Sequence, residues 1–270
     1  MMRAWVLETP RPARDRPLKL RDVPVPVPGS GQVLIKVAAC GICRTDLHVI
    51  EGDLEPRRSG VIPGHQIVGR VVAAGPNVPG SRVGERVGVA WLHRTCGACR
   101  FCAGGRENLC DVPSFTGWSV NGGFAEFALA DADFVYPLPA GFDDLSAAPL
   151  LCAGIIGYRS LRLTGLAERH DSWSGARLGI YGFGAAGHVV IQLARAWGAR
   201  VFVCTRDRER HQDLARVLGA EWVGGACDAP PQPLDSAIIF APAGDLVPPA
   251  LQALDKGGVR YLVAGGLAVN

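Results

Sequence analysis

The chain has 270 residues, of which 48% are hydrophobic and 20% charged, with a formal net charge of +3 at pH 7. This composition is ordinary for a globular protein of one large or two modest domains, and it excludes a nucleic-acid-binding surface dominated by lysine and arginine. No apolar run reaches the ~18 residues of a membrane span, and the N-terminal segment lacks the apolar core of a signal peptide. We therefore expect a cytoplasmic protein whose partners include neither a membrane nor a nucleic acid.

The N-terminal half of the chain predicts a β-rich domain. Short runs of strand-forming residues are separated there by glycine and proline, which end strands and start turns. The predicted strands are Gln32–Ala39, Ile67–Ala74, Arg86–Val89 and Phe124–Leu129. Frequent turns between short strands are typical of a compact β unit.

Three residues of this half carry side chains that bind metals. Cys43 lies in CGICRTDLH, His65 in GHQIVG and Cys152 in PLLCAG. Taken singly, a cysteine beside apolar residues is usually a core residue, and a histidine beside glycine is often a turn residue. If the three converge, two thiolates and one imidazole leave a fourth position open, as catalytic zinc requires. Spacing alone leaves both interpretations open.

A cluster of four cysteines gives a stronger signal. Cys96, Cys99, Cys102 and Cys110 follow the spacing Cys-x2-Cys-x2-Cys-x7-Cys. Tight two-residue gaps present neighbouring thiolates to one metal, and four thiolates complete a closed structural zinc site. The bacterial iron–sulfur alternative continues with x3 and Cys-Pro, which is absent here. The remaining cysteines, Cys40, Cys204 and Cys227, are predicted to be ordinary core residues.

The second half predicts alternating strands and helices, the pattern of a parallel sheet covered by helices. The predicted strands are Leu178–Tyr181, Val201–Cys204, Ala237–Phe240 and Val259–Ala264, and the predicted helices are Ala185–Trp197, Asp207–Leu218 and Leu246–Leu254. Between the first strand and the first helix, Gly182, Gly184 and Gly187 form a Gly-x-Gly-x-x-Gly turn. This context predicts a dinucleotide site with the pyrophosphate at the helix N-terminus.

The end of the second strand bears on cofactor choice. NAD-binding proteins carry an acidic residue about 20 positions after the first glycine to bind the ribose. Here the strand runs into Thr205 and Arg206, and Arg210 follows. A hydroxyl and guanidinium groups suit a 2′-phosphate, so NADP(H) is favoured over NAD(H). The alternative is a solvated helix start capped by Asp207.

These motifs, in this order over nearly the whole chain, resemble the zinc-containing alcohol dehydrogenases of the medium-chain dehydrogenase/reductase family. The resemblance implies an α/β plus β architecture. A GroES-like β-rich catalytic domain, residues 1–153, is followed by a Rossmann doubly wound parallel sheet, residues 154–270. It implies hydride transfer between a nicotinamide cofactor and a small alcohol or aldehyde. Trp91 and Trp118 either line the substrate pocket or are core aromatics.

The resemblance also implies residue roles. Cys43, His65 and Cys152 match the catalytic zinc ligands, and the four clustered cysteines match the structural zinc ligands, giving two Zn²⁺ per chain. Thr45 matches the hydroxyl that binds the substrate oxygen, His48 the far end of a proton relay, and Asp46 the carboxylate that orients the imidazole.

Two departures from the family bear on these expectations. Gln66 stands where the family usually has glutamate, which makes the site less negative; we expect a lower pKa of the zinc-bound oxygen and altered zinc exchange. The chain stops at Asn270, whereas family members continue, so we expect an incomplete Rossmann sheet and leave a homo-oligomer open. A non-catalytic zinc- and nucleotide-binding remnant is the alternative function, and a zinc-finger-like nucleic-acid module fits poorly.

Overall fold

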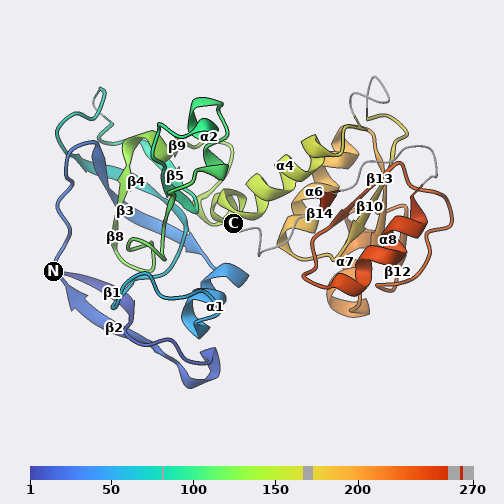
Figure 1. Ribbon diagram of the computed structural model, residues 1–270, viewed down its shortest axis with the longest axis horizontal. Helices are drawn as coiled ribbons and strands as arrows, with labels where there is room; N and C mark the ends of the chain where they lie inside the picture. The colour runs from blue at the N-terminus through green and yellow to red at the C-terminus, as the bar shows by residue number, and fades with distance from the viewer. Residues whose placement is uncertain (81, 167–172, 255–261, 264–270) are drawn as a thin grey trace. The chain divides into compact units, whose positions relative to one another are not determined.

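The computed structural model describes residues 1–80, 82–166, 173–254 and 262–263. The chain forms two compact units, Met1–Cys152 and Ala153–Asn270, whose elements are labelled in Figure 1. Among the described residues, no helix combines the length and the apolarity needed to cross a bilayer.

The first unit is built on an antiparallel five-stranded sheet. Its strand order is β8-β3-β4-β5-β9, with β3 Gln32–Gly41, β4 Gln66–Ala74, β5 Arg86–Val89, β8 Phe127–Asp131 and β9 Val135–Pro137. Alternating Val, Ile and Ala side chains from these strands form a buried core in which Val33, Ile35 and Ile67 are fully shielded from solvent. Burial of such β-branched side chains on one face of a pleated sheet fixes the strand register.

Smaller elements flank this sheet. Among the described residues of this unit, two two-stranded pairs, β1 with β2 and β6 with β7, and three short helices accompany the sheet, together with single 3-10 turns. Their bounds are β1 Met2–Leu7, β2 Leu18–Val23, β6 Leu92–Arg94, β7 Ser114–Phe115, α1 Arg44–Glu51, α2 Arg100–Ala103 and α3 Asp144–Ala147. The sequence pattern did not predict β1, β2 or α1.

The predicted strand Phe124–Leu129 begins three residues too early. The observed strand β8 starts at Phe127, because Phe124 and Ala125 pair with β1 instead: the Trp5 N–H donates to the Phe124 carbonyl at 2.8 Å, and Ala4 bridges Ala125. The chain thus passes from one sheet to another within a single apolar run, which periodicity cannot resolve.

Close approach between β3 and β4 requires a glycine, which gives the first testable prediction. A Cβ added at Gly69 would lie 2.3 Å from the Lys36 carbonyl oxygen, whereas one added at Gly141 would meet nothing within 4 Å. We expect Gly69→Ala to lower the free energy of unfolding by about 3 kcal/mol, because the strands must separate to admit the methyl group. Guanidinium denaturation measures this, with Gly141→Ala as the control; equal stability of the two variants would contradict it.

The second unit contains a parallel five-stranded sheet. Its order is β12-β11-β10-β13-β14, with β10 Arg177–Tyr181, β11 Arg200–Cys204, β12 Trp222–Gly224, β13 Ser236–Ile239 and β14 Leu262–Val263. The first strand lies in the middle and later strands extend to both sides, which is the doubly wound arrangement. The predicted strand Val259–Ala264 lies outside the described residues except for β14.

Helices cover both faces of this sheet. One buried cluster joins β10 and β11 to α4 Ala153–Leu163, α6 Ala185–Ala196 and α7 Asp213–Val217. A second cluster on the other face includes Tyr181, Phe202 and Ile239 and is covered by α8 Val247–Ala253. The predicted helix Asp207–Leu218 is a π-helical turn, Arg208–Gln212, followed by α7.

The three cysteines predicted to be core residues differ in their surroundings. Cys204 is fully buried and Cys40 is half-buried against the antiparallel sheet, as expected. Cys227 is exposed, so its assignment to the core was wrong. It lies in the loop between the end of β12 and the start of β13, outside the sheet.

Candidate active site

Cys43, His65 and Cys152 converge within the first unit. The Cys43 sulfur lies 3.4 Å from Nε2 of His65 and 4.0 Å from the Cys152 sulfur, and the three potential ligand atoms all lie within 4.8 Å of one another. Tetrahedral zinc with bonds of about 2.0–2.3 Å separates its ligands by roughly 3.3–3.8 Å. The donor set and its spacing therefore fit a zinc ion bound by two sulfurs and one nitrogen.

The N-terminus of α1 holds two of the side chains in place. Cys43 is the N-cap, and its sulfur accepts a hydrogen bond from the Thr45 backbone N–H at 3.3 Å. In return, Asp46 accepts from the Cys43 backbone N–H at 2.8 Å, which completes a capping box. This local pattern holds the Cys43 sulfur at the N-terminus of α1, where the Asp46 carboxylate is buried.

Asp46 also fixes the imidazole of His65. Its other carboxylate oxygen accepts a hydrogen bond from Nδ1 of His65 at 2.9 Å, and both side chains are almost completely buried. With its proton on Nδ1, the ring presents the Nε2 lone pair to the two sulfurs. Asp46 and His65 thus form a buried hydrogen-bonded pair.

His65 reaches this position through a glycine turn. Gly64 has φ +96°, and a Cβ there would lie 2.5 Å from the Phe124 ring and 2.9 Å from the Cys40 sulfur. Only glycine tolerates both the left-handed backbone and the close packing. The turn delivers His65 to the start of β4, facing Cys43.

The three side chains strongly influence each other's protonation. The hydrogen bond from Cys152, aided by His65, lowers the pKa of Cys43 to about 3 although burial opposes this shift. Burial would lower the pKa of His65, but hydrogen bonds to Asp46 and Cys43 outweigh it and raise the pKa to about 9. The hydrogen bond to Cys43 raises the pKa of Cys152. A bound metal must displace the protons on His65 and Cys152.

The Asp46 contacts give a second prediction. We expect Asp46→Asn to weaken metal binding at this site by about 10- to 100-fold, because the neutral amide no longer anchors the imidazole as a charged acceptor. Competition with a chromophoric chelator measures the affinity. Asp22→Asn, an exposed change on β2, is the control. An unchanged affinity in Asp46→Asn would show that the carboxylate does not support the ligand.

Thr45 and His48 lie on α1 next to this cluster. The Thr45 side chain is half-buried, and its backbone N–H is the group that donates to the Cys43 sulfur. Nδ1 of His48 pairs with the Asp53 carboxylate at 2.7 Å, and 17% of the His48 side chain is exposed. The sequence analysis missed Asp53; its place just after the helix-ending Gly52, five residues beyond His48, was the available signal. Asp53 thus holds the His48 ring through its Nδ1 atom.

Aromatic rings line one side of the cluster. Trp91 meets the His65 ring edge-on at 5.1 Å between centroids, and it stacks on Trp118 at 5.9 Å. Trp91 is half-buried, whereas Trp118 is 7% exposed and donates from its indole N–H to the Glu55 carbonyl. Trp118 also lines a cavity of about 290 Å³. Of these two tryptophans, Trp91 therefore contacts the metal-ligand cluster, and Trp118 stacks on Trp91.

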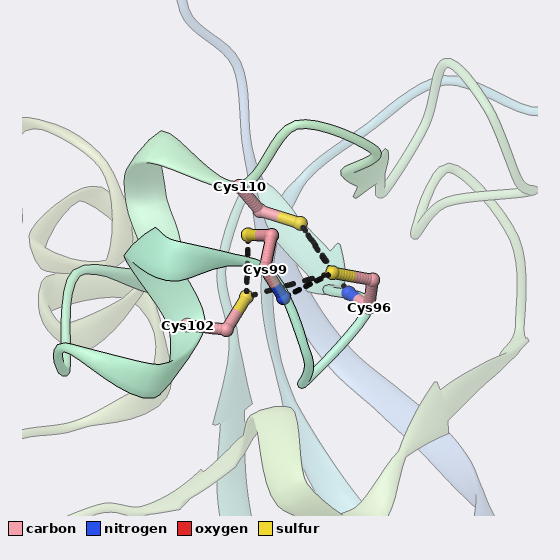
Figure 2. A group of neighbouring side chains, drawn as sticks. All are labelled: Cys96, Cys99, Cys102 and Cys110. Atoms are coloured by element: carbon pink, nitrogen blue, oxygen red, sulfur yellow. Dashed lines mark hydrogen bonds between the residues drawn. The ribbon is translucent and has the colours of Figure 1, made fainter.

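The four clustered cysteines form a second candidate metal centre. Figure 2 shows their sulfurs turned toward one another, with Sγ–Sγ distances of 3.5 Å for Cys99–Cys102, 3.6 Å for Cys96–Cys110 and 3.9 Å for Cys96–Cys102. Backbone N–H groups donate to the sulfurs of Cys96 and Cys110. Backbone hydrogen bonds from Cys102 and Asp111 lower the pKa of Cys99 to about 6. The four sulfurs, gathered in this way, fit a closed zinc site that holds the loop in place.

The glycine turn of the second unit has the shape that a dinucleotide needs. Gly182 has φ +90°, and a Cβ there would lie 2.8 Å from the backbone of Ala241. A Cβ at Gly184 would meet nothing within 4 Å, so space is open above it, and no side chain caps the N-terminus of α6. A Cβ added at Gly187 would lie 3.2 Å from the Gly182 carbonyl oxygen, so the helix start packs closely against the turn. Free N–H groups beside open space fit a pyrophosphate.

The residues after β11 divide into buried and exposed ones. Thr205 is 4% exposed, and its carbonyl accepts from the Gln212 side chain. Arg206 and Arg210 are exposed, and Arg210 lies 3.9 Å from Asp207. Asp207 caps the following turn by accepting from the Arg210 N–H at 2.8 Å. The capping interpretation of Asp207 therefore holds; the Arg210 guanidinium also pairs with Asp207, and the Arg206 side chain is exposed.

Comparison with known proteins agrees with this arrangement. Residues 29–140 match the family model of the alcohol dehydrogenase GroES-like domain. The chain is 50% identical over 263 residues to a probable alcohol dehydrogenase, AdhA, of Mycobacterium tuberculosis, covering 96% of this chain and 74% of that protein.

Solved structures show the same fold. The CAD from Helicobacter pylori complexed with NADP(H) superposes with a TM-score of 0.85 at 25% identity, covering 98% of this chain and 75% of that one. The cobalt- and zinc-bound thermostable alcohol dehydrogenase from Pyrobaculum aerophilum gives a TM-score of 0.81 at 28% identity, covering 98% and 76%.

The antiparallel sheet is thus a GroES-like domain and the parallel sheet a Rossmann domain, as the sequence predicted. The named relatives are enzymes, which disfavours the non-catalytic alternative. Identity of 50% over most of both chains, together with the shared fold, shows that this chain belongs to the zinc-containing alcohol dehydrogenases of the medium-chain dehydrogenase/reductase family and is an oxidoreductase acting on alcohols.

Proposed function

We propose that the enzyme interconverts a small alcohol and its aldehyde with NADP(H), using one catalytic and one structural zinc ion. Residues 1–153 form the catalytic domain and residues 154–270 the nucleotide-binding domain in this proposal. The convergence of Cys43, His65 and Cys152, with Nδ1 of His65 held by Asp46, is the observation that supports it most directly. The four-cysteine cluster supports the second zinc ion.

The donor chemistry determines what the metal site offers. Two thiolates balance the charge of Zn²⁺, and three protein ligands leave a fourth position for the substrate oxygen. Zinc bound there supplies Lewis acidity, which polarises a carbonyl and favours loss of the hydroxyl proton. The buried Asp46–His65 pair keeps the imidazole from rotating and so keeps the open position fixed.

The residues of α1 handle the proton. The Thr45 hydroxyl, half-buried beside Cys43, hydrogen-bonds the substrate oxygen and orients it. His48 accepts the released proton at Nε2, because its Nδ1 is engaged with Asp53 and its partial exposure allows exchange with water. Trp91, half-buried against His65, excludes water from the apolar part of the substrate.

The second unit binds the cofactor. Gly182, Gly184 and Gly187 let the pyrophosphate approach the N-terminus of α6. The nicotinamide supplies the hydride acceptor or donor. Arg206 and Arg210 bind the 2′-phosphate, and Thr205, which is buried, contributes mainly by shaping the end of β11. The NADP(H) complex of the Helicobacter pylori neighbour supports this choice.

Absorbance at 340 nm tests the proposal. Purified protein of measured zinc content is offered NADPH or NADH with a panel of small aldehydes, and then NADP⁺ or NAD⁺ with the alcohols. We expect aldehyde-dependent loss of absorbance, faster with NADPH, and two zinc ions per chain. Activity with NADH alone would reject the cofactor assignment. Binding of zinc and nucleotide without turnover would favour the non-catalytic alternative.

A further inference from the structure

The cavity that Trp118 lines is formed by residues outside the metal-ligand cluster. It has a volume of about 290 Å³ and is lined by the end of β1, by Val49 of α1, by residues 56–59 and by Trp118. Of the described residues that line it, none is a proposed metal ligand, and neither Thr45 nor His48 is among them. Cavities that hold small organic ligands begin at roughly 300 Å³, so this one suits a molecule with a short carbon chain.

Apolar side chains form the walls of the cavity, and hydrogen bonds hold these walls in place. The buried residues of the lining are Leu7, Val49, Val61 and Trp118. The Leu7 N–H donates to the Val61 carbonyl at 2.8 Å, and the Trp118 indole N–H donates to the Glu55 carbonyl at 3.0 Å. Because the walls are already formed, a ligand that enters orders few side chains, which favours its affinity.

The exposed side of the cavity carries positive charge. Cζ of Arg57 lies 4.7 Å from the centre of the Trp118 ring, a cation–π contact that keeps the guanidinium group at the aromatic wall. Arg58 also lines the cavity, and within the described part of the chain neither arginine forms an ion pair. Glu8, the acidic residue of the lining, is itself paired with Arg21 at 2.9 Å. Two guanidinium groups beside an apolar wall therefore lack an anionic partner among the described residues.

We propose that this cavity binds a small organic carboxylate as a second ligand, separate from the alcohol: its apolar body packs against Trp118, and its carboxylate pairs with Arg57 and Arg58. A guanidinium group matches a carboxylate in charge and in the spacing of two parallel hydrogen bonds. An alkylammonium ion would be repelled, and an inorganic anion would leave the apolar walls uncovered. Because Trp118 stacks on Trp91, the bound carboxylate adjoins the aromatic wall of the proposed active site.

Isothermal titration calorimetry of the full chain with sodium hexanoate tests this proposal. Hexanamide lacks the charge of this probe and acetate lacks its apolar body, so we expect hexanoate to bind about tenfold more tightly than either. Arg57→Gln should weaken hexanoate binding about tenfold, because it removes a hydrogen bond between charged groups. The Arg57 side chain is exposed, so this change does not disturb the core. Arg14→Gln removes an exposed arginine of the same unit that does not line the cavity, and it is the matched control.

Carboxylates also bind metal ions, so the same titration on Cys43→Ser separates the cavity from the proposed metal site. Binding that persists in Cys43→Ser and in Arg14→Gln but weakens in Arg57→Gln would support the proposal. Undiminished binding in Arg57→Gln would overturn it, and loss of binding in Cys43→Ser would place hexanoate on the proposed metal ion instead. Equal affinities for hexanoate and hexanamide, or equal weakening in Arg57→Gln and Arg14→Gln, would also overturn it. None of these readouts needs turnover, so they are independent of the proposed activity.

Discussion

Replacing Cys43 with serine is expected to remove one of two bound metal ions and to lower kcat/KM for alcohol oxidation by about 1000-fold. The Cys43 sulfur contacts both of the other ligand side chains, so its loss disrupts the whole three-residue cluster. Lewis-acid stabilisation of several kcal/mol is lost with the metal, and each 1.36 kcal/mol is about tenfold in rate. Metal analysis and the 340 nm assay measure the two effects on the same sample.

Two cysteine variants serve as controls for this result. Cys227→Ser removes an exposed sulfur far along the chain and should leave both metal content and activity unchanged. Cys99→Ser should also lose one metal ion. Its main effect should be a lower thermal stability, because a closed four-thiolate site holds its loop in place and does no chemistry. Full activity of Cys43→Ser with two metal ions would reject the assignment of Cys43 as a ligand.

Removing the two guanidinium groups after β11 is expected to reverse the cofactor preference. The double variant Arg206→Ala with Arg210→Ala should lower kcat/KM for NADPH by about 100-fold, since each hydrogen bond to a charged partner contributes roughly 1.5–3 kcal/mol. Values for NADH should change little, because that cofactor has no 2′-phosphate for these side chains to bind. Steady-state kinetics with both cofactors at one fixed aldehyde concentration measure the ratio.

Arg208→Ala is the matched control for this pair. Arg208 is exposed and lies in the same π-helical turn as Arg210, so its removal changes the local charge as much as either single replacement. A similar loss in Arg208→Ala would indicate general electrostatic attraction rather than a phosphate contact. An unchanged NADPH to NADH ratio in the double variant would contradict 2′-phosphate binding by Arg206 and Arg210.

The sequence predicted the elements whose signals are local. The four cysteines lie within 15 residues of chain, and the tight turns between them bring their sulfurs together. The glycine turn between β10 and α6 likewise follows from the neighbouring residues alone. By contrast, β1 and β2 carry mixed patterns, and they form a ribbon only because they pair with each other across an intervening loop. The predicted domain boundary at residue 153 stays a prediction.

Tertiary structure alone decided what surrounds the metal-ligand cluster. Cys43 and Cys152 are 109 positions apart, and only the packing of the GroES-like sheet brings their sulfurs to 4.0 Å. The pairing of His48 with Asp53 and the packing of the Gln66 side chain against Gly41 have no periodic signature.

The sequence by itself therefore determined the donor atoms and the order of the two domains, because residue type and short spacing encode local chemistry. The tertiary structure decided which donors meet and which carboxylate holds which ring. Those contacts join residues whose separation along the chain carries no local information, and strand pairing and side-chain packing alone bring them together.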